Sequence, residues 1–249
     1  MASELAKGLE YLTVLGPGKV IVLLSTMPGD KLTYLSRHIE HKKILGVLRH
    51  ASVRTVSAIV KRSDVQALVD LMNALAVEDT VALLGQVEVD SIVLFLSHLD
   101  TPRLVRIIQG IGVARMLELL SATGPERALV LARDLPTENL VALVKKVPMT
   151  ELAPLALRLK VDFLARLMKA DTAEHLSQLI KSVGARNVLE LIHYLGEKEI
   201  LGLTERLKAQ KMKGLIYLIH GMKLKPEKKP VRKPAAKAKK PRAKKAKPK

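Results

Sequence analysis

The sequence predicts an all-α protein, in which about 18 short helices stack into an elongated superhelix that ends in a disordered basic tail. Three observations predict this class. Apolar residues recur every twelve positions, Gly and Pro separate the apolar groups, and positive charge gathers in the last 27 of the 249 residues. The apolar content of 48% is ample for a large core. We place the superhelix at residues 1–221 and the tail at residues 222–249.

The twelve-residue period rests on four apolar registers. From Leu71, steps of twelve in both directions reach an apolar residue at all 18 positions between Tyr11 and Leu215. Within one unit the four registers stand at i, i+3, i+4 and i+7, which is one face of an α-helix. A continuous helix would turn this face by about 120° with every unit, so each unit must be a separate helix. The other three registers contain Leu68, Met72 and Leu75, and they are interrupted only at Gly8, Thr80, Ser36, Thr204, Ser63, Thr123 and Asp171.

Helix-breaking residues fall between the apolar groups. Gly and Pro suit the residues just after one helix and at the start of the next. Acids favour the first turn of each predicted helix and cations favour the last turn, as the helix dipole requires. Helices of about nine residues are too short to be stable alone, so they must stack. We expect Pro154 to shorten or kink its helix, and Gly46, Gly202 and Gly214 to allow neighbouring helices to approach closely. The predicted breaks are Gly16-Pro17-Gly18, Pro28-Gly29, Pro102, Gly112, Gly124-Pro125, Pro136, Pro148, Gly184 and Gly196.

One stretch resembles a known family. Residues 135–159, LPTENLVALVKKVPMTELAPLALRL, are similar to the pattern L-P-x-E-x-x-x-L-x-x-x-L. That pattern marks the cytoplasmic N-terminal domain of MgtE-type magnesium transporters and related armadillo-like segments of the flagellar switch protein FliG. The resemblance implies a right-handed α-solenoid. It does not imply transport, because no CBS-like or transmembrane segment follows and cations dilute the acidic surface.

The C-terminal segment predicts a partner class. Residues 223–249 hold 14 Lys and Arg against one acid, a net charge of +13 out of +18 for the chain. Lys, Ala and Pro cannot bury enough apolar surface to fold, so we expect disorder. The composition resembles the tails of linker histones and bacterial histone-like proteins, and it suits phosphates without base readout. A solubilising or nuclear-import role is the alternative. The candidate nucleic-acid-binding residues are Lys228, Lys229, Arg232, Lys233, Lys237, Lys239, Lys240, Arg242, Lys244, Lys245, Lys247 and Lys249.

A second group of cations lies on the predicted helices. Arg37, Arg49 and Lys61 are twelve apart, and a superhelix would align that register as a row with one cation per helix, about 10 Å apart. Such a row could follow a phosphate backbone, although complementation of the helix dipole predicts the same placement. The candidate secondary basic stripe comprises Arg37, Lys42, Lys43, Arg49, Arg54, Lys61, Arg62, Lys145, Lys146 and Lys181.

Several functional classes are excluded by the sequence. The chain has no Cys, and it lacks a phosphate-binding loop, a nucleophile elbow and a His-Glu-x-x-His motif, so we expect no enzyme and no cofactor. His38 and His41 are three residues apart and His50 is twelve beyond His38, so three imidazoles could bind zinc. No cysteine or well-spaced carboxylate completes the set and all three lie among cations, so we expect no metal. No apolar stretch is long enough for a membrane span, and we expect no transmembrane segment.

Two functions remain. The first is a scaffold whose tail binds DNA or RNA without sequence preference while the superhelix docks a protein partner or wraps the duplex; it would be cytoplasmic and nucleoid-associated, or nuclear in a eukaryote. The second is a protein-interaction adaptor whose tail binds an acidic partner, an anionic membrane surface or polyphosphate.

Overall fold

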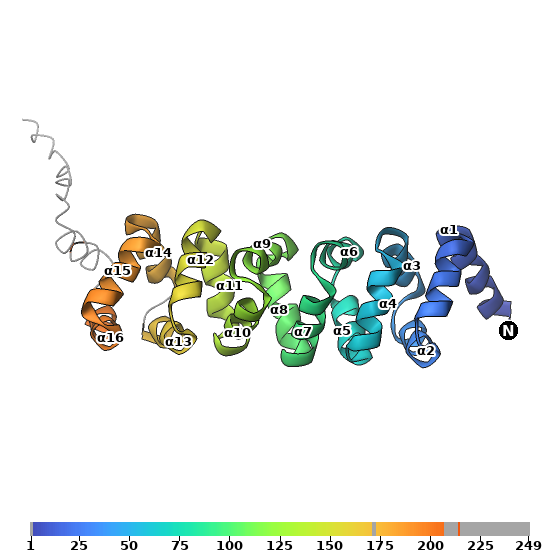
Figure 1. Cartoon of the computed structure of the whole chain (residues 1–249), viewed down its shortest axis with the longest axis horizontal. Coiled ribbons are helices and arrows are strands. Elements are labelled where there is room, and N and C mark those ends of the chain that lie inside the picture. The colour runs from blue at the N-terminus through green and yellow to red at the C-terminus, as the bar shows by residue number, and fades with distance from the viewer. Residues whose placement is uncertain (1, 171–172, 207–213, 215–249) are drawn as a thin grey trace, which may run out of the picture.

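The computed structural model describes residues 2–170, 173–206 and 214. Within them all regular secondary structure is helical, and the helices form one elongated row from α1 to α16 (Figure 1). The predicted all-α solenoid is confirmed. The helices are α1 Ala2–Thr26, α2 Gly29–His38, α3 His41–His50, α4 Val53–Arg62, α5 Val65–Ala74, α6 Val77–Gln86, α7 Val89–His98, α8 Thr101–Ile111, α9 Val113–Thr123, α10 Pro125–Asp134, α11 Thr137–Lys146, α12 Met149–Arg158, α13 Val161–Ala170, α14 Ala173–Val183, α15 Ala185–Leu195 and α16 Glu197–Arg206.

The joint between two helices has one recurring design. The residue after each helix still donates its N–H to the carbonyl four residues earlier, as Ile39 does to Leu35 at 3.0 Å. The next residue is extended, with φ between −54° and −70° at the joints before α2 to α8, α11 and α12. At Gly112, Gly124, Gly184 and Gly196 a single glycine takes both positions: it donates its N–H to the carbonyl four residues earlier and, like Gly16 within α1, has φ between +77° and +84°. Glycine is needed there, because other residues rarely adopt this backbone conformation.

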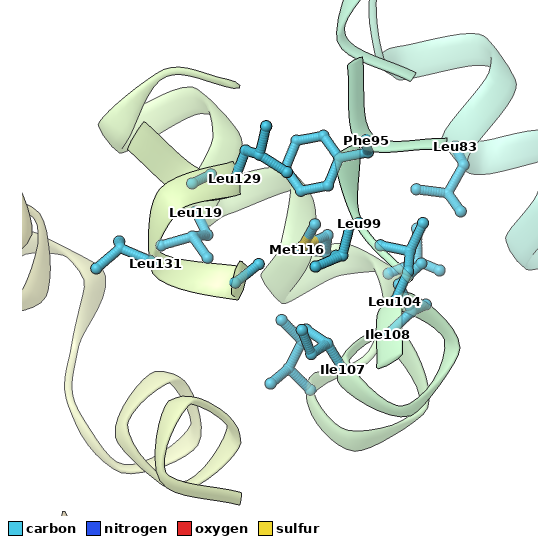
Figure 2. Close-up of a cluster of buried hydrophobic side chains, with 14 of the residues drawn as sticks. Leu83, Phe95, Leu99, Leu104, Ile107, Ile108, Met116, Leu119, Leu129 and Leu131 are labelled. Atoms are coloured by element: carbon cyan, nitrogen blue, oxygen red, sulfur yellow. The ribbon is translucent and has the colours of Figure 1, made fainter. Parts of the chain in front are cut away.

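The predicted core registers form the interior. In the Leu71 register every residue from Leu23 to Leu191 is buried. Figure 2 shows part of this interior, where Phe95 of α7 lies close to Leu129 of α10. The polar interruptions Thr80, Ser63 and Thr123 are buried too, and each hydroxyl donates to the carbonyl four residues earlier in its own helix. These hydroxyls therefore do not break the core, because none of them lacks a hydrogen-bond partner.

The helices stack in three columns, because each helix packs on the third helix after it. One column contains α2, α5, α8, α11 and α14, the second α3, α6, α9, α12 and α15, and the third α4, α7, α10, α13 and α16. Three helices, or 36 residues, thus make one turn of the superhelix. Helix α1 contacts both α3 and α4, because Gly16 divides it into two segments that act as separate helices.

Side chains in the first turn of a helix tie successive turns together. The Lys31 ammonium donates to the carbonyls of Val60, Lys61 and Ser63 at 2.6, 3.3 and 3.1 Å. Arg127 likewise donates from Nε to the carbonyl of Ala156 at 2.5 Å, and also to that of Leu159. These cations lie at the negative end of another helix, where their charge stabilises the otherwise unpaired carbonyls. The same twelve-residue register supplies equivalent bonds from Lys19, Lys43, Arg103 and Asn139.

Two sequence expectations need correction. Pro154 lies inside α12, which runs unbroken from Met149 to Arg158. Its missing N–H would have bonded to Thr150, whose exposed position in the first turn allows water to serve instead. Close approach is confirmed at Gly46, where an added Cβ would stand 3.0 Å from Val77, but no atom of the described residues lies within 4 Å of an added Cβ at Gly202 or Gly214.

Candidate functional site

The predicted nucleic-acid-binding residues of the tail, Lys228 to Lys249, lie outside the described residues. Their assignment stays a prediction, as does the boundary between superhelix and tail. The described part of the candidate site is therefore the superhelix surface.

The secondary basic residues gather mainly on one superhelical turn. Residues 29–62, which form α2, α3 and α4, hold eight Lys and Arg against two acids. We call this segment the basic turn. Five of its cations, Arg37, Lys42, Arg49, Arg54 and Lys61, are exposed to solvent. The positive potential of such a surface attracts polyanions, most strongly at low salt.

Two further cations of the basic turn, like Lys31 above, have internal partners. Half-buried Lys43 donates to the carbonyl of Asn73 at 3.1 Å, and Arg62 pairs with Asp90 of α7. Both contacts join the basic turn to the next turn of the superhelix. These two cations are thus less available to a ligand than the five exposed cations above, which have no such partner among the described residues.

The expected single row of cations is not what the structure forms. Arg37, Arg49 and Lys61 lie on α2, α3 and α4, which belong to three different columns, so they surround the superhelix instead of running along it. Arg37 shares its column with Lys145 and Lys146 of α11 and with Lys181 of α14. Between them, Asn73 and Gln109 occupy the same register and donate to carbonyls at the end of the stacked helix, at 2.9 and 3.2 Å. The column is therefore interrupted by neutral amides.

Local pairing also affects the cation register further along. Arg133 donates to the Asp134 carboxylate at 2.7 and 3.2 Å. This hydrogen bond lowers the pKa of Asp134 and outweighs the opposing effect of burial, and the nearby charges of Arg133 and Arg103 lower the pKa further. Arg133 is thus neutralised by its neighbour in the sequence.

An acidic turn follows the basic turn, and the sequence analysis missed it. Residues 64–98, which form α5, α6 and α7, hold six acids and no Lys or Arg. We call this segment the acidic turn. The signal was present in the sequence as the long interval without a cation between Arg62 and Arg103. It gains meaning only with the structure, which makes these three helices one complete turn.

An open groove of about 760 Å³ runs from the acidic turn onto α9 and the start of α12. Its floor is largely apolar, with Ala82, Val113, Leu117 and Met149 among its lining residues. Exposed Glu78, Asp79 and Glu118 also line it. We call it the acidic groove. A second groove, of about 970 Å³, follows between α12 and α15 in the same column.

Two of the three histidines considered for a metal site, His38 and His41, have other partners. The His38 ring stacks on Tyr34, with ring centroids 4.0 Å apart, and its Nδ1 lies 2.8 Å from the Tyr34 carbonyl. His41 Nε2 lies 2.9 Å from Glu10 and its ring packs edge-on against Tyr11. Burial, and to a lesser degree the charge of Glu10, raises the pKa of Tyr11. In the described part of the chain, no group of three or more His, Asp or Glu residues is placed to hold a metal ion.

The first helix carries the most apolar surface. Leu9–Thr26 has the length and a mean hydropathy, 1.3, typical of a membrane span, and only 11% of it is buried. The helical backbone is interrupted within it at Gly16. Two joined helices, Val77–Gln86 and Val89–His98, satisfy the same criterion together but are bent by 116°. Such helices also occur in the cores of soluble proteins, so they are weak evidence for membrane insertion.

Comparison with known proteins gives no family. No family model, no curated protein and no solved structure matches the chain.

Proposed function

We propose that the protein is a non-enzymatic scaffold that binds nucleic acid without sequence preference through its basic tail. The observation that carries this proposal is the net charge of +13 in residues 223–249. Lysines in a Lys/Ala/Pro chain meet phosphates and not base edges, so the affinity comes from release of counterions. Nucleoid association, or nuclear location in a eukaryote, follows from the same proposal.

The superhelix supports this proposal as a rigid carrier. The five exposed cations of the basic turn offer a second contact for the same polyanion, distant from the tail along the chain. Because they surround the superhelix, they suit a duplex that crosses the body better than one that follows its axis. A relation to the MgtE and FliG domains remains a proposal that rests on the Leu-Pro-x-Glu motif.

The test compares three full-length proteins. In one variant the twelve candidate cations of the tail are changed to Gln, and in the other Arg37, Arg49 and Lys61 are changed to Gln. With about ten phosphate contacts, wild-type affinity for random-sequence duplex should fall with a log–log salt slope near −9. The tail variant should lose most of the affinity and most of the slope, measured by fluorescence anisotropy. Unchanged binding by the tail variant would contradict the proposal.

A protein-interaction adaptor is the second candidate, and the two grooves favour it. They lie in one column of helices and have volumes of about 760 and 970 Å³. Solenoids commonly bind partners along such extended surfaces. A pull-down from the native host with and without nuclease separates the two functions. A partner that survives nuclease supports the adaptor, whereas loss of all partners supports bridging by nucleic acid.

A further inference from the structure

We propose that the acidic groove binds the C-terminal Lys/Ala/Pro segment of the same chain, residues 223–249. The occupant thus belongs to the molecule, and the groove holds the tail when no polyanion is present. Competition between the groove and nucleic acid for the tail rests on the proposed function, but binding of the tail to the groove does not.

The acidic turn carries an excess of negative charge that would attract the tail. The acidic turn lacks any Lys or Arg, so its carboxylates are not balanced from within the turn. Asp90 pairs with Arg62, and Asp64 accepts a hydrogen bond from the backbone of Gln66. Among the described residues, neither Glu78 nor Asp79 has such a partner. The helix dipole accounts for an acid in the first turn of α6, but two adjacent ones without a cation leave charge to attract a ligand.

The shape and chemistry of the acidic groove suit a chain of Lys, Ala and Pro. Its apolar floor, with Ala82 and Leu117, can cover the methylene stems of lysine together with alanine and proline side chains. The carboxylates of Glu78, Asp79 and Glu118 can then receive the ammonium groups. Glu118 already pairs with Arg115 at 2.5 Å, with about half of its own side chain exposed, so it has room for a second cation. Lys, Ala and Pro are the residues of which the tail is made.

The acidic groove also lies within reach of the C-terminal tail. The predicted tail, residues 222–249, follows the superhelix and would span up to about 90 Å when extended. The groove at α9 lies about two and a third superhelical turns before α16, roughly 25 Å at about 10 Å per stacked helix. The sequence predicts a flexible tail at residues 222–249, and 28 such residues have a typical end-to-end distance of about 30 Å. Tethering at this range gives an effective concentration on the order of millimolar, so weak ion pairs suffice for binding.

The partner is one stretch of this chain and not any cation-rich surface. The neighbouring basic turn, with eight cations, repels other cations, and it confines favourable binding to the acidic turn and its groove. A second copy of the chain could present the same tail only at its bulk concentration. At micromolar protein the groove therefore binds the tail of its own chain in preference to the tail of a second copy.

Zero-length carbodiimide cross-linking of the full-length protein at low salt tests the proposal. The reagent joins a carboxylate to an amine in contact with it, and mass spectrometry identifies the pair. We expect tail lysines to be joined to Glu78, Asp79 or Glu118 in preference to the exposed acids Glu126 and Glu138. A mixture of ¹⁴N and ¹⁵N protein should give links within one chain. Links spread evenly over all exposed acids, or links between light and heavy chains, would overturn the proposal.

A matched pair of variants gives a second readout. Glu78→Gln/Asp79→Asn/Glu118→Gln removes three groove charges, and Glu126→Gln/Glu138→Gln/Asp162→Asn removes three exposed charges elsewhere. Each surface pair is worth a factor of about two to five, so the groove variant should bind random-sequence duplex about tenfold more tightly than the control variant. Equal gains would show general electrostatics and overturn the groove. If no protein binds duplex, the proposed function fails, while the cross-links of the wild type still decide the inference.

Discussion

At the scale of single residues, the joints depend on what the twelve-residue register places after each helix. Gly112, with φ +81° and ψ 154°, occupies the position that an extended residue with negative φ fills at most other joints. A helix that precedes a glycine joint ends one residue later than the others, and the positive φ of the glycine still directs the chain into the next column. A side chain at Gly112 would meet no atom within 4 Å, so any cost of a substitution comes from the backbone alone.

Gly112→Ala should therefore destabilise the protein by about 1–3 kcal/mol, because alanine is strained at this positive φ. Gly85→Ala is the matched control: Gly85 is helical, exposed and free of close contacts, so alanine there should be neutral or stabilise by up to about 1 kcal/mol. Urea denaturation of both variants measures the difference. A Gly112→Ala protein as stable as Gly85→Ala would show that the joint relaxes to the other conformation.

The core registers give a second prediction at this scale. Leu143 and Leu167 are each 3% exposed, whereas Leu157 is 55% exposed and lies outside the four registers. Leu143→Asp or Leu167→Asp should cost several kcal/mol, because the carboxylate would be buried without a partner. Leu157→Asp should stay within about 0.5 kcal/mol of the wild type. Thermal unfolding of the three variants checks the order, and equal midpoints would mean that the helical face is misassigned.

At the scale of elements, side chains from one turn cap the helices of the next. Arg127, on α10, is half-buried and donates to two carbonyls at the end of α12. Sequence reasoning assigned cations to the last turn of their own helix and so missed this role for first-turn cations. The bonds join residues about 30 positions apart, and that pairing appears only once three helices are known to make one turn.

Arg127→Met keeps most of the apolar stem and removes these bonds. We expect a loss of about 1–3 kcal/mol in the free energy of unfolding, because two buried carbonyls lose a charged donor. Arg158→Met, at an exposed position on α12, should change stability by less than about 0.5 kcal/mol. Chemical denaturation followed by circular dichroism compares the two, and a loss of equal size in both would contradict the capping role.

The elements also show how far the sequence could predict the structure. Burial follows the twelve-residue period, so the core from Leu23 to Leu191 and the glycine joints were predictable. The period does not contain the angle between consecutive helices, which the joint conformation sets. For this reason the prediction that Arg37, Arg49 and Lys61 form one row along the superhelix was wrong, and the acidic groove was not predicted from the sequence. The kink or shortening predicted at Pro154 was also wrong, because the exposed first turn of α12 tolerates the loss of one hydrogen bond.

At the scale of the whole molecule, charge is arranged by superhelical turns. The basic turn and the acidic turn are adjacent, and Arg62 and Asp90 join them by an ion pair. A polyanion is therefore attracted to the basic turn and a polycation to the acidic turn of the same superhelix. Under the two proposals above, the tail binds either an external polyanion or the acidic groove, and this competition would regulate the scaffold without any change in the fold.

The stacked architecture predicts a gradient of stability along the molecule. A helix in the middle packs against one helix before it and one after it in its column, whereas α1 and α2 lack the earlier one. The consequence is visible at Leu24, which is 64% exposed although Leu48 and Val60 of the same register are 3% and 0% exposed. Where nearest neighbours supply most of the stability, the ends open before the centre.

Amide hydrogen exchange of the full-length protein should show this gradient. After correction for intrinsic rates, the amides of α1 and α2 should exchange about tenfold or more faster than those of α7 to α10, because opening the end breaks fewer helix contacts. Leu24→Gln should leave the exchange of α7 to α10 unchanged, since its side chain is already exposed, whereas Leu48→Gln should accelerate exchange throughout the first turns. Uniform protection from α1 to α10 would mean that the superhelix opens in a single cooperative step, and the nearest-neighbour description would then be wrong for this protein.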